Sequence, residues 1–520
     1  MPIPELQQPE MVNENRAPKL AGYDFYHSVL GAPRYVVAPM VDQSELAWRM
    51  LCRRYGAQLC YSPMYHANLF ATDLKYRKDA LQTCPEDRPL IIQFCGNDPQ
   101  QILEAALAAQ DHCDAVDINL GCPQAIAKRG HYGSFLQDEW ELLTEIVRTL
   151  HEKLSVPVTC KIRRFEDREK TIKYAKMLEA AGCQLLTVHG RTREQKGPLT
   201  GIADWSYIKD VRQHVKIPMF ANGNILGLDD VHRCLDETGV DGVMSAEGNL
   251  HNPALFQGIA PPVWQMAKEY LELVDQYPCP TSYIRGHLFK LFHHIMNIRS
   301  NAQLREQLAT GNQLTQFHAV VAKVQEKYEP YHTGVTKYEP EEMEVNMSAD
   351  GGEELPMLQP WLCQPYIRAS PESHRQKIAE KQREAVDPNR TKRQYFDNAG
   401  NEISRKRMKK LRRRQRRPNK TDAQFQLRHE RHLEYCEQCA NPLGSKCEFR
   451  LCRICCRDKC YADDCDCPGH GILIKSRRAK AKQFEAHCRQ ENNNDSVPIV
   501  PAANRTAIDR DDPALADNVS

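Results

Sequence analysis

The sequence predicts an α/β protein: a (β/α)8 TIM barrel, then a small helical domain and a cysteine-rich C-terminal module. Between Tyr35 and Phe256, short apolar runs alternate with longer stretches of helical periodicity, which indicates parallel strands joined by helices. A span of roughly 220 to 250 residues is the size of such a barrel. A doubly wound open sheet is the alternative that the same alternation permits.

The predicted strands lie in eight runs: YVVAPM from Tyr35, AQLCYSP from Ala57, LIIQFC from Leu90, AVDIN from Ala115, VTCKI from Val158, LLTVHG from Leu185, MFANG from Met219 and GVMSA from Gly242. Polar or reactive residues stand at the carboxyl ends of nearly all runs: Met40, Gln93, Asn119, Lys161, His189, Asn222 and Glu247. Because a TIM barrel builds its active site at that rim, these residues favour the barrel over the open sheet.

Helices are expected from Pro262 to about Tyr331. In the stretch IRGHLFKLFHHIMNIR, apolar residues recur at helical spacing, and they leave a charged face of Arg285, Lys290, His294 and Arg299. That face is either a solvated surface or a surface that contacts RNA. The stretch WLCQPYIR, from Trp361, restores packing residues further along the chain.

Shifts in composition divide the chain into segments. We predict an N-terminal extension (1–30), the catalytic barrel (31–260), a helical domain (261–372) with an acidic insertion (339–354), a basic linker (373–430), the cysteine-rich module (431–472) and a polar tail (473–520). The tail is expected to be disordered, because it has too few apolar residues to form a core.

Composition excludes several classes of protein. The 520 residues carry a formal net charge of +2, so the overall charge indicates neither a nucleic-acid nor a membrane partner. No stretch approaches the ~20 apolar residues of a membrane span, and the N-terminus lacks the apolar region of an export signal. We therefore expect a monomer with reduced thiols in the cytoplasm, the nucleus or both.

A dense basic run, RKRMKKLRRRQRRPNK from Arg405, holds eleven Lys or Arg in sixteen positions. Such a run repels itself unless an anion or solvent neutralises it. It indicates an arm that contacts RNA phosphates or a nuclear-import signal, and a plain charged helix is the alternative.

Nine of the 21 cysteines lie between Cys436 and Cys467. Pairs spaced C-x2-C bring two thiolates to one tetrahedral ion, so we predict a structural zinc module, with a redox-sensitive tail as the alternative. The candidate ligands, which suffice for one ion or two, are Cys436, Cys439, Cys447, Cys452, Cys455, Cys456, Cys460, Cys465, Cys467 and His470.

The rim residues suit a flavin mononucleotide (FMN). This cofactor needs close backbone approach under its ring, a hydrogen-bonding partner for its pyrimidine edge and a cation near N1 and O2. We assign these roles to Pro39, Met40 and Val41, to Gln93, and to Lys161, respectively. The phosphate is assigned to the loops after the seventh and eighth strands, at Asn222, Gly223, Asn224, Ala246 and Glu247.

A single cysteine in INLGCPQ stands between Gly121 and Pro123, directly after a predicted strand. Glycine permits unusual φ values and proline fixes φ, so the turn is sharp and stiff. Such a turn presents the thiol of Cys122 to a bound molecule.

Six motifs occur in order at these strand ends: APM at Ala38, QFCGNDP at Gln93, DINLGCPQ at Asp117, KIRR at Lys161, VHGRTREQKG at Val188 and ANGNI at Ala221. Over residues 23–258 the chain closely resembles the tRNA-dihydrouridine synthase family. Its flanking stretches and cysteine-rich tail resemble the eukaryotic branch that acts at tRNA positions 16 and 17.

The resemblance implies a reaction and a substrate. In it, NADPH reduces FMN, a hydride passes from flavin N5 to C6 of a tRNA uracil, and an acid protonates C5. Cys122 matches the family's proton donor, and Lys161 and His189 match residues that contact flavin and uracil. Asn119 is expected to position the pyrimidine and Arg191 to support its loop. The uracil must leave its stack to reach the rim.

One departure from the family pattern concerns the phosphate. The family often has Gly-Arg after the eighth strand, where this chain has Ala246 and Glu247. Phosphate binding must therefore depend on backbone amides or on another cation.

Two other functions compete with this interpretation. A flavin barrel that reduces a small molecule would explain the rim, but not the helical domain, the basic run or the cysteine-rich tail. A binding protein that keeps an inactive barrel is the other class, and the presence of Cys122 and Lys161 argues against it.

Overall fold

The computed structural model describes residues 19–339, 358–368, 370–386, 404, 407–408, 436–439, 443, 447–476 and 478–479. Two compact units divide between Met408 and Lys409, and each is described by itself. The acidic insertion beyond Glu339, nearly all of the basic run and the tail beyond 479 lie outside the described residues.

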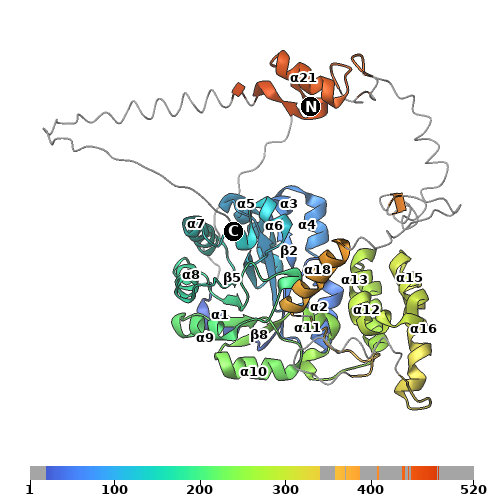
Figure 1. The fold of residues 1–520 in the computed structure, drawn as a ribbon. Coiled ribbons are helices and arrows are strands. Elements are labelled where there is room, and N and C mark those ends of the chain that lie inside the picture. The colour runs from blue at the N-terminus through green and yellow to red at the C-terminus, as the bar shows by residue number, and fades with distance from the viewer. Residues whose placement is uncertain are drawn as a thin grey trace, which may run out of the picture. The chain divides into compact units, whose positions relative to one another are not determined.

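The first unit contains a closed barrel of eight parallel strands, which confirms the predicted barrel and excludes the open sheet (Figure 1). Each strand pairs with the next in chain order, and β8 pairs with β1. Every predicted run overlaps one strand: β1 (Tyr35–Val37), β2 (Leu59–His66), β3 (Leu90–Cys95), β4 (Ala115–Leu120), β5 (Val158–Arg163), β6 (Leu186–His189), β7 (Met219–Asn222) and β8 (Gly242–Ser245).

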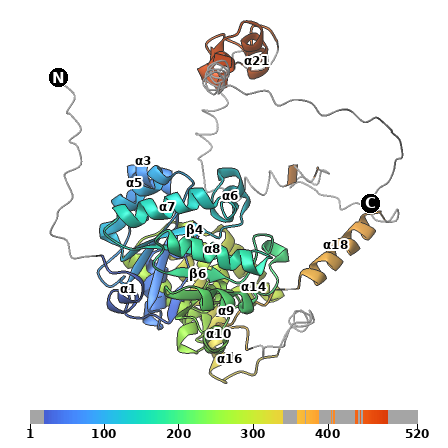
Figure 2. The same ribbon diagram turned by 90° about the vertical axis from the view of Figure 1, so that its left-hand side faces the viewer.

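Helices between the strands cover the outside of the barrel (Figures 1 and 2). Aspartate side chains at Asp73, Asp98, Asp167 and Asp204 accept hydrogen bonds from backbone amides and so define four helix starts. The helices are α2 (Leu46–Arg54), α3 (Ala67–Thr72), α4 (Leu74–Ala80), α5 (Pro99–Ala109), α6 (Ala125–Gly130), α7 (Trp140–Lys153), α8 (Arg168–Ala180), α9 (Trp205–His214), α10 (Leu228–Thr238) and α11 (Glu247–His251).

Alternate strand residues face the inside of the barrel, as the two-residue period of a strand requires. The interior cluster includes Leu59, Tyr61 and Phe220, all fully buried. Helix α1 (Gly22–Ser28) contributes Phe25 and Tyr26 to the same cluster, although these residues fall in the predicted N-terminal extension. Because α1 closes the barrel beside the amino ends of its strands, the opposite rim is left for ligands.

The helices predicted between Pro262 and Tyr331 are present beside the barrel (Figure 1): α12 (Val263–Gln276), α13 (Thr281–Leu291), α14 (His293–Asn297), α15 (Ala302–Thr310) and α16 (Leu314–His332). The proposed charged face is not one solvated surface. Of its four residues only Arg299 is exposed, and His294 Nε2 lies 3.2 Å from the carbonyl oxygen of Pro365. Arg285, Lys290 and His294 are partly exposed, so residues 358–368 cover part of this face and leave part of it open.

A buried polar network joins the helical domain to α2. The Glu45 carboxylate lies 2.9 Å from His287 Nε2 and accepts a 2.7 Å hydrogen bond from Tyr270 Oη. The Trp48 ring stacks on His287 with 4.0 Å between ring centroids. Since buried polar groups are costly unless paired, this network fixes α12 and α13 in one position against the barrel.

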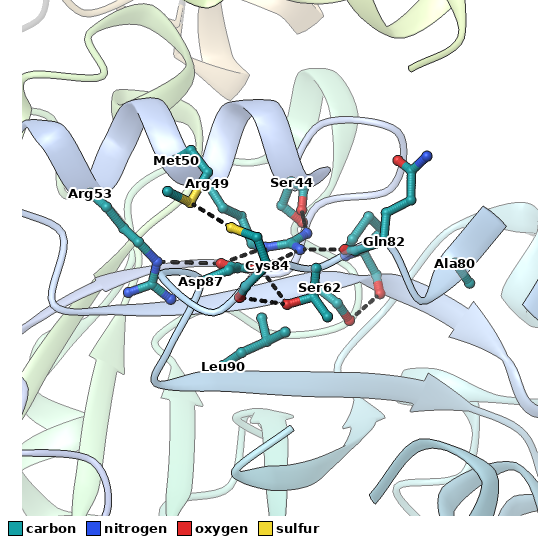
Figure 3. Close-up of polar contacts among 12 residues, drawn as sticks. Ser44, Arg49, Met50, Arg53, Ser62, Ala80, Gln82, Cys84, Asp87 and Leu90 are labelled. Carbon is teal, nitrogen blue, oxygen red and sulfur yellow. Dashed lines mark hydrogen bonds and ion pairs between the residues drawn. The ribbon is translucent and has the colours of Figure 1, made fainter. Parts of the chain in front are cut away.

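A second buried network holds the loop before β3 against α2 (Figure 3). The fully buried Asp87 carboxylate lies 2.6 Å from Arg49 and 3.3 Å from Arg53. Arg49 also donates a 2.7 Å hydrogen bond to the carbonyl oxygen of Ser44. Both guanidinium groups point toward Asp87, so two cations neutralise the buried negative charge.

The remaining elements are helix α18 (Pro371–Val386) in the first unit, and α21 (Arg453–Ala462) with a hairpin of β9 (Asp466–Cys467) and β10 (Ile472–Leu473) in the second. In the second unit, buried cysteines pack with Leu451 and Ile472. Across the parts of the chain that the structure describes, no helix combines the length and apolar character needed to span a membrane.

Candidate functional site

Strand register brings the predicted rim residues together. Asn119 is the partner of Lys161 across β4 and β5, and His189 is the partner of Asn222 across β6 and β7. Parallel strands point their carboxyl ends to the same rim, so these four side chains lie on neighbouring strands of one barrel end.

The turn that carries Cys122 is fixed by hydrogen bonds. Asn119 Oδ1 accepts from the amides of Gly121, at 3.2 Å, and Cys122, at 2.8 Å. Ser134 Oγ donates to the Cys122 carbonyl oxygen at 3.0 Å. At Gly133, with φ of +68°, a Cβ would lie 2.8 Å from that same oxygen, so only glycine fits this contact. The Cys122 thiol is thereby held in place while remaining half-buried.

Burial raises the pKa of the Cys122 thiol above its ordinary value, and the nearby cations Arg163, Lys161 and Lys196 only partly oppose the shift. Arg163 Nε donates to the carbonyl oxygen of Gly121 at 2.9 Å, which places its charge beside the turn. A thiol in this environment keeps its proton at neutral pH, as a proton donor requires.

Behind the turn, a hydrogen-bonded chain orients Asn119. Gln93 Oε1 accepts from Asn119 Nδ2 at 2.8 Å, and Gln93 Nε2 donates to Asp117 at 2.7 Å. Thr159 Oγ1 donates to the other Asp117 oxygen at 2.6 Å. Burial raises the pKa of Asp117 to about 6, despite these hydrogen bonds. Gln93 is fully buried, so its amide sets the direction of Asn119 in addition to any contact with a ligand.

Lys161 is a buried cation. Its side chain is only 9% exposed, and Nζ donates to Asn222 Oδ1 at 2.9 Å. Asn222 Nδ2 in turn donates to the Met244 carbonyl oxygen at 2.8 Å. Burial, aided by the charge of Arg163, lowers the pKa of Lys161 to about 8. Within the described residues no carboxylate forms an ion pair with this ammonium, which suits it to an anionic ligand.

His189 is neutral, because burial and three neighbouring cations lower its pKa well below the ordinary value. Its Nε2 lies 3.1 Å from an Arg191 guanidinium nitrogen and therefore accepts the hydrogen bond. Arg191 also donates to the Gly201 carbonyl oxygen at 2.9 Å and to the side chain of Asn224. Arg191 thus ties the loop after β6 to the loop after β7.

The loops after β7 and β8 are in direct contact. Ser245 Oγ donates to the Ile225 carbonyl oxygen at 3.0 Å. A Cβ on Gly248 would lie 2.3 Å from that oxygen. At Gly223, with φ of +114°, a Cβ would lie 2.6 Å from Ala203 Cβ, so the loop needs glycine here.

The remaining predicted cofactor residues follow β1. The Met40 amide donates to Ser44 Oγ at 3.0 Å, which closes the turn after Pro39. Val41 is 53% exposed at the outer edge of this turn. The backbone of this turn lies at the same carboxyl-terminal rim as Asn119 and Lys161.

Glu247, in the loop after β8, forms ion pairs with two cations. Arg368 binds it in a bidentate ion pair, with 2.9 Å from Nε to Oε2 and 2.7 Å from a terminal nitrogen to Oε1. Lys290 Nζ lies 3.6 Å from Oε1. The sequence interpretation gave Arg368 no site role and placed Lys290 only on the charged face of the helical domain. The only sequence signal was the position of Arg368 at the end of WLCQPYIR.

In the second unit, eight of the ten predicted ligands form two groups of four. One group is Cys436, Cys439, Cys452 and Cys455, and the other is Cys447, Cys456, Cys467 and His470; within each, all ligand atoms lie within 4.8 Å of one another. Distances of 3.5 Å and 3.6 Å join Cys439 Sγ to the sulfurs of Cys455 and Cys452. Four thiolates at ~2.3 Å from one ion are separated by similar lengths.

Cys460 and Cys465 belong to neither group. The adjacent Cys455 and Cys456 lie on α21 and belong to different groups, because successive helical residues point about 100° apart. The two groups are therefore interleaved along the chain, and α21 serves both.

The family model for dihydrouridine synthase (Dus) matches residues 36–329. A Mus musculus protein named tRNA-dihydrouridine(16/17) synthase [NAD(P)(+)]-like is 52% identical over 474 residues, 89% of this chain and 93% of the relative. The Schizosaccharomyces pombe tRNA-dihydrouridine(16/17) synthase [NAD(P)(+)] is 47% identical over 370 residues, 67% of this chain and 91% of the relative. A Mus musculus tRNA-dihydrouridine(20a/20b) synthase-like protein is 34% identical over 313 residues, 59% and 91% of the two chains.

Proposed function

The chain belongs to the dihydrouridine synthase family, and from that premise we propose that it uses FMN and NADPH to reduce the C5–C6 bond of uridine in the D-loop of tRNA, at positions 16 and 17. The observation that carries the proposal is Cys122, which is protonated, half-buried and held on a fixed turn at the barrel rim. The printed names of the relatives support tRNA as the substrate and NAD(P)H as the source of electrons.

The residues present fit FMN. Lys161 offers a buried ammonium that donates a hydrogen bond to the neutral side chain of Asn222. The anionic edge of a reduced flavin would stabilise this ammonium. Pro39 and Met40 would face the ring, and the loop at Gly223 would lie beside the phosphate. When bound, FMN would supply a hydride for C6 of the uracil.

Cys122 would then donate its thiol proton to C5. The thiol does not need to be a thiolate at any point before transfer, which agrees with a pKa raised by burial. Asn119 fixes the backbone of this turn through Oδ1 while its Nδ2 is bound to Gln93, so the thiol direction depends on the chain of hydrogen bonds behind it. The charge of Lys161 lowers the Cys122 pKa, so this ammonium would stabilise the thiolate that remains after the transfer until solvent protonates it again.

His189 and Arg191 would orient the flavin and the uracil. Neutral His189 accepts a hydrogen bond at Nε2, so its Nδ1 carries the proton and can donate to a carbonyl oxygen of a ligand. This assignment of the proton follows from the Arg191 contact, because a guanidinium cannot accept a hydrogen bond.

A tRNA would approach this rim from the side of the loop after β6. Lys196 Nζ donates to the Pro123 carbonyl oxygen at 3.0 Å, and Arg193 donates to the Ser134 carbonyl oxygen at 3.3 Å. Both cations therefore lie beside the turn of Cys122, where a flipped nucleotide would enter with its phosphates. A small-molecule substrate would not need them.

We also infer that the second unit holds two structural zinc ions, one in each group of four ligands. Groups with four protein ligands leave no coordination position open for catalysis, so the metal would stabilise the module. Helix α21 would contribute ligands to both ions and so connect the two sites.

The proposal is tested by mapping dihydrouridine, position by position, in tRNA from cells that lack the protein and are rescued with wild type, Cys122→Ala or Cys84→Ala. Cys84 is the matched control, because it is a half-buried thiol in the loop before β3, with its sulfur 3.8 Å from Met50 Sδ of α2. We expect wild type and Cys84→Ala to restore positions 16 and 17, and Cys122→Ala to lower the rate by about 10²- to 10⁴-fold. Unchanged dihydrouridine in the deleted cells would reject the function. Reduction of free uridine at the same efficiency as tRNA would favour the small-molecule alternative.

A further inference from the structure

Two cations from distant parts of the chain converge on Glu247. Arg368 forms a bidentate pair with the carboxylate, and Lys290 of α13 lies 3.6 Å from Oε1. The side chains of Glu247, Lys290 and Arg368 are 29%, 32% and 43% exposed, so the group lies at an accessible surface. An exposed pair of this kind adds little stability, which leaves the arrangement without a structural explanation.

The group lies at the place where TIM barrels commonly bind phosphate. Glu247 is the second residue after the end of β8. Gly248 touches the loop after β7 so closely that a Cβ would lie 2.3 Å from the Ile225 carbonyl oxygen. Arg191, bound to Asn224 in that loop, is near enough for the charges of Glu247 and Arg368 to influence its pKa. The cations therefore surround the two loops after β7 and β8.

We propose that Arg368 and Lys290 bind the phosphate group of FMN, and that the Glu247 carboxylate occupies these two cations as a competing anion until the phosphate displaces it. The inference rests on the proposed function, since it presupposes FMN at the rim. It identifies cations that take the place of the arginine that the family often carries after the eighth strand.

The balance of charge supports this assignment. Arg191, Lys290 and Arg368 against Glu247 leave a net charge of +2 beside the two loops. A phosphate monoester carries about −1.5 to −2 at neutral pH. The neighbouring His293 adds no charge, because burial lowers its pKa to about 4.

The geometry supports it as well. A guanidinium that binds a carboxylate with two parallel hydrogen bonds can bind two phosphate oxygens in the same way. Arg368 is brought to the rim by residues 358–368, which are anchored where the Val263 amide donates to the Trp361 carbonyl oxygen at 2.8 Å and the Cys363 amide to that of Pro261 at 2.9 Å. This gives the WLCQPYIR stretch a role beyond packing.

The test compares the dissociation constants of FMN and riboflavin, which share the ring and differ in the phosphate. Titration by flavin fluorescence is carried out on the full chain as wild type, Arg368→Gln, Lys290→Gln and Glu247→Gln. Arg375→Gln is the matched control, because Arg375 forms an exposed ion pair with Glu372 on α18, outside the site.

Wild type and the control are expected to bind FMN more tightly than riboflavin. Arg368→Gln and Lys290→Gln should each weaken FMN binding about tenfold and leave riboflavin binding unchanged, because one charge-assisted hydrogen bond to the phosphate is lost. Glu247→Gln should strengthen FMN binding, since a competing negative charge is removed.

An FMN-to-riboflavin ratio that stays the same in both Arg368→Gln and Lys290→Gln would overturn the phosphate assignment and leave the proposed function standing. Weaker FMN binding in Glu247→Gln would overturn the role given to the carboxylate. If wild type binds neither flavin, the proposed function itself fails.

Discussion

The barrel and the cysteine-rich module keep their shape by different means. The barrel has a continuous core in which large side chains such as Trp48, Phe94 and Tyr174 are fully buried. In the described part of the module, the buried residues are cysteines together with Leu451 and Ile472. A unit of this size, below or near ~40 residues, rarely folds on apolar burial alone. The apolar core of the barrel therefore supports a polar rim without metal, whereas we expect the module to depend on metal ions.

The same residue type serves both regions in opposite ways. Cys160 and Cys183 are fully buried in the barrel, where they act as small apolar side chains. Seven cysteines of the module converge with His470 in two groups of four, as metal ligands do. Cys122 is the third case, a thiol presented at a rim. The surroundings of a cysteine, and not its frequency, decide its role.

Metal removal should separate the two regions most strongly. Zinc binding to small Cys-rich sites contributes about 10–16 kcal/mol to their folding. We expect a strong chelator to raise hydrogen exchange throughout residues 447–476 and to leave the barrel strands protected, as measured by hydrogen-exchange mass spectrometry. Restored protection after zinc is added back serves as the control. A module that stays protected in the chelator would contradict this view.

A break in the buried ion pairs should produce the next largest effect, confined to the barrel. Asp87→Asn removes the buried carboxylate that pairs with Arg49 and Arg53 and leaves their charges unpaired. The free energy of unfolding should therefore fall by about 3–5 kcal/mol. Glu169→Gln is the control, because its ion pair with Lys173 is exposed and its loss should cost less than about 1 kcal/mol. Urea unfolding, followed by tryptophan fluorescence, measures the free energy of unfolding of both variants. An equal loss of stability in the two variants would contradict the importance given to the buried ion pairs.

A smaller effect, with a defined pH dependence, should come from Lys161. In the flavin-free barrel, burial lowers its pKa from 10.5 to about 8. Below pH 8, Lys161 is protonated in both the folded and the unfolded chain. The folded state is then destabilised by the full free energy of burying a charged ammonium. Between pH 8 and 10.5 the unfolded chain still binds the proton that the barrel has released, and stability rises with pH.

Lys161→Met should therefore be more stable than wild type near neutral pH, by up to about 3 kcal/mol, and the difference should shrink above pH 8. Thermal unfolding of the flavin-free proteins at several pH values measures this. Lys209→Met, at an exposed position of α9, is the control and should show no such pH dependence. A difference that does not vary between pH 7 and 10 would refute the assignment.

The smallest effect is expected at the cysteines outside the two groups. Cys465→Ser should keep two zinc ions per chain and change module stability by less than about 1 kcal/mol, because serine is close in size to this partly buried thiol and Cys465 is in neither group. Cys467→Ser should lose one ion, since Cys467 belongs to the second group. Metal content measured by mass spectrometry distinguishes them, and loss of zinc in Cys465→Ser would show that the grouping is wrong.

Several features could be read from the sequence because they depend on near neighbours in the chain. Alternation of apolar runs with helical stretches specified the barrel, since the strand period is local. Asn119 and Lys161 could be assigned to one rim because parallel strands end on the same side. The C-x2-C spacing of Cys436 with Cys439 and of Cys452 with Cys455 indicated shared ions for the same local reason.

Other features were decided only by the tertiary structure. Arg368 and Glu247 are 121 positions apart, and Lys290 comes from a helical domain that sequence periodicity could assign only to a charged face. Periodicity tells which side of an element is buried, but not which distant element packs against it. The sequence by itself therefore determined the barrel, its rim and the presence of a cysteine module. Packing between elements decided which cations meet at the rim and which thiols lie close together.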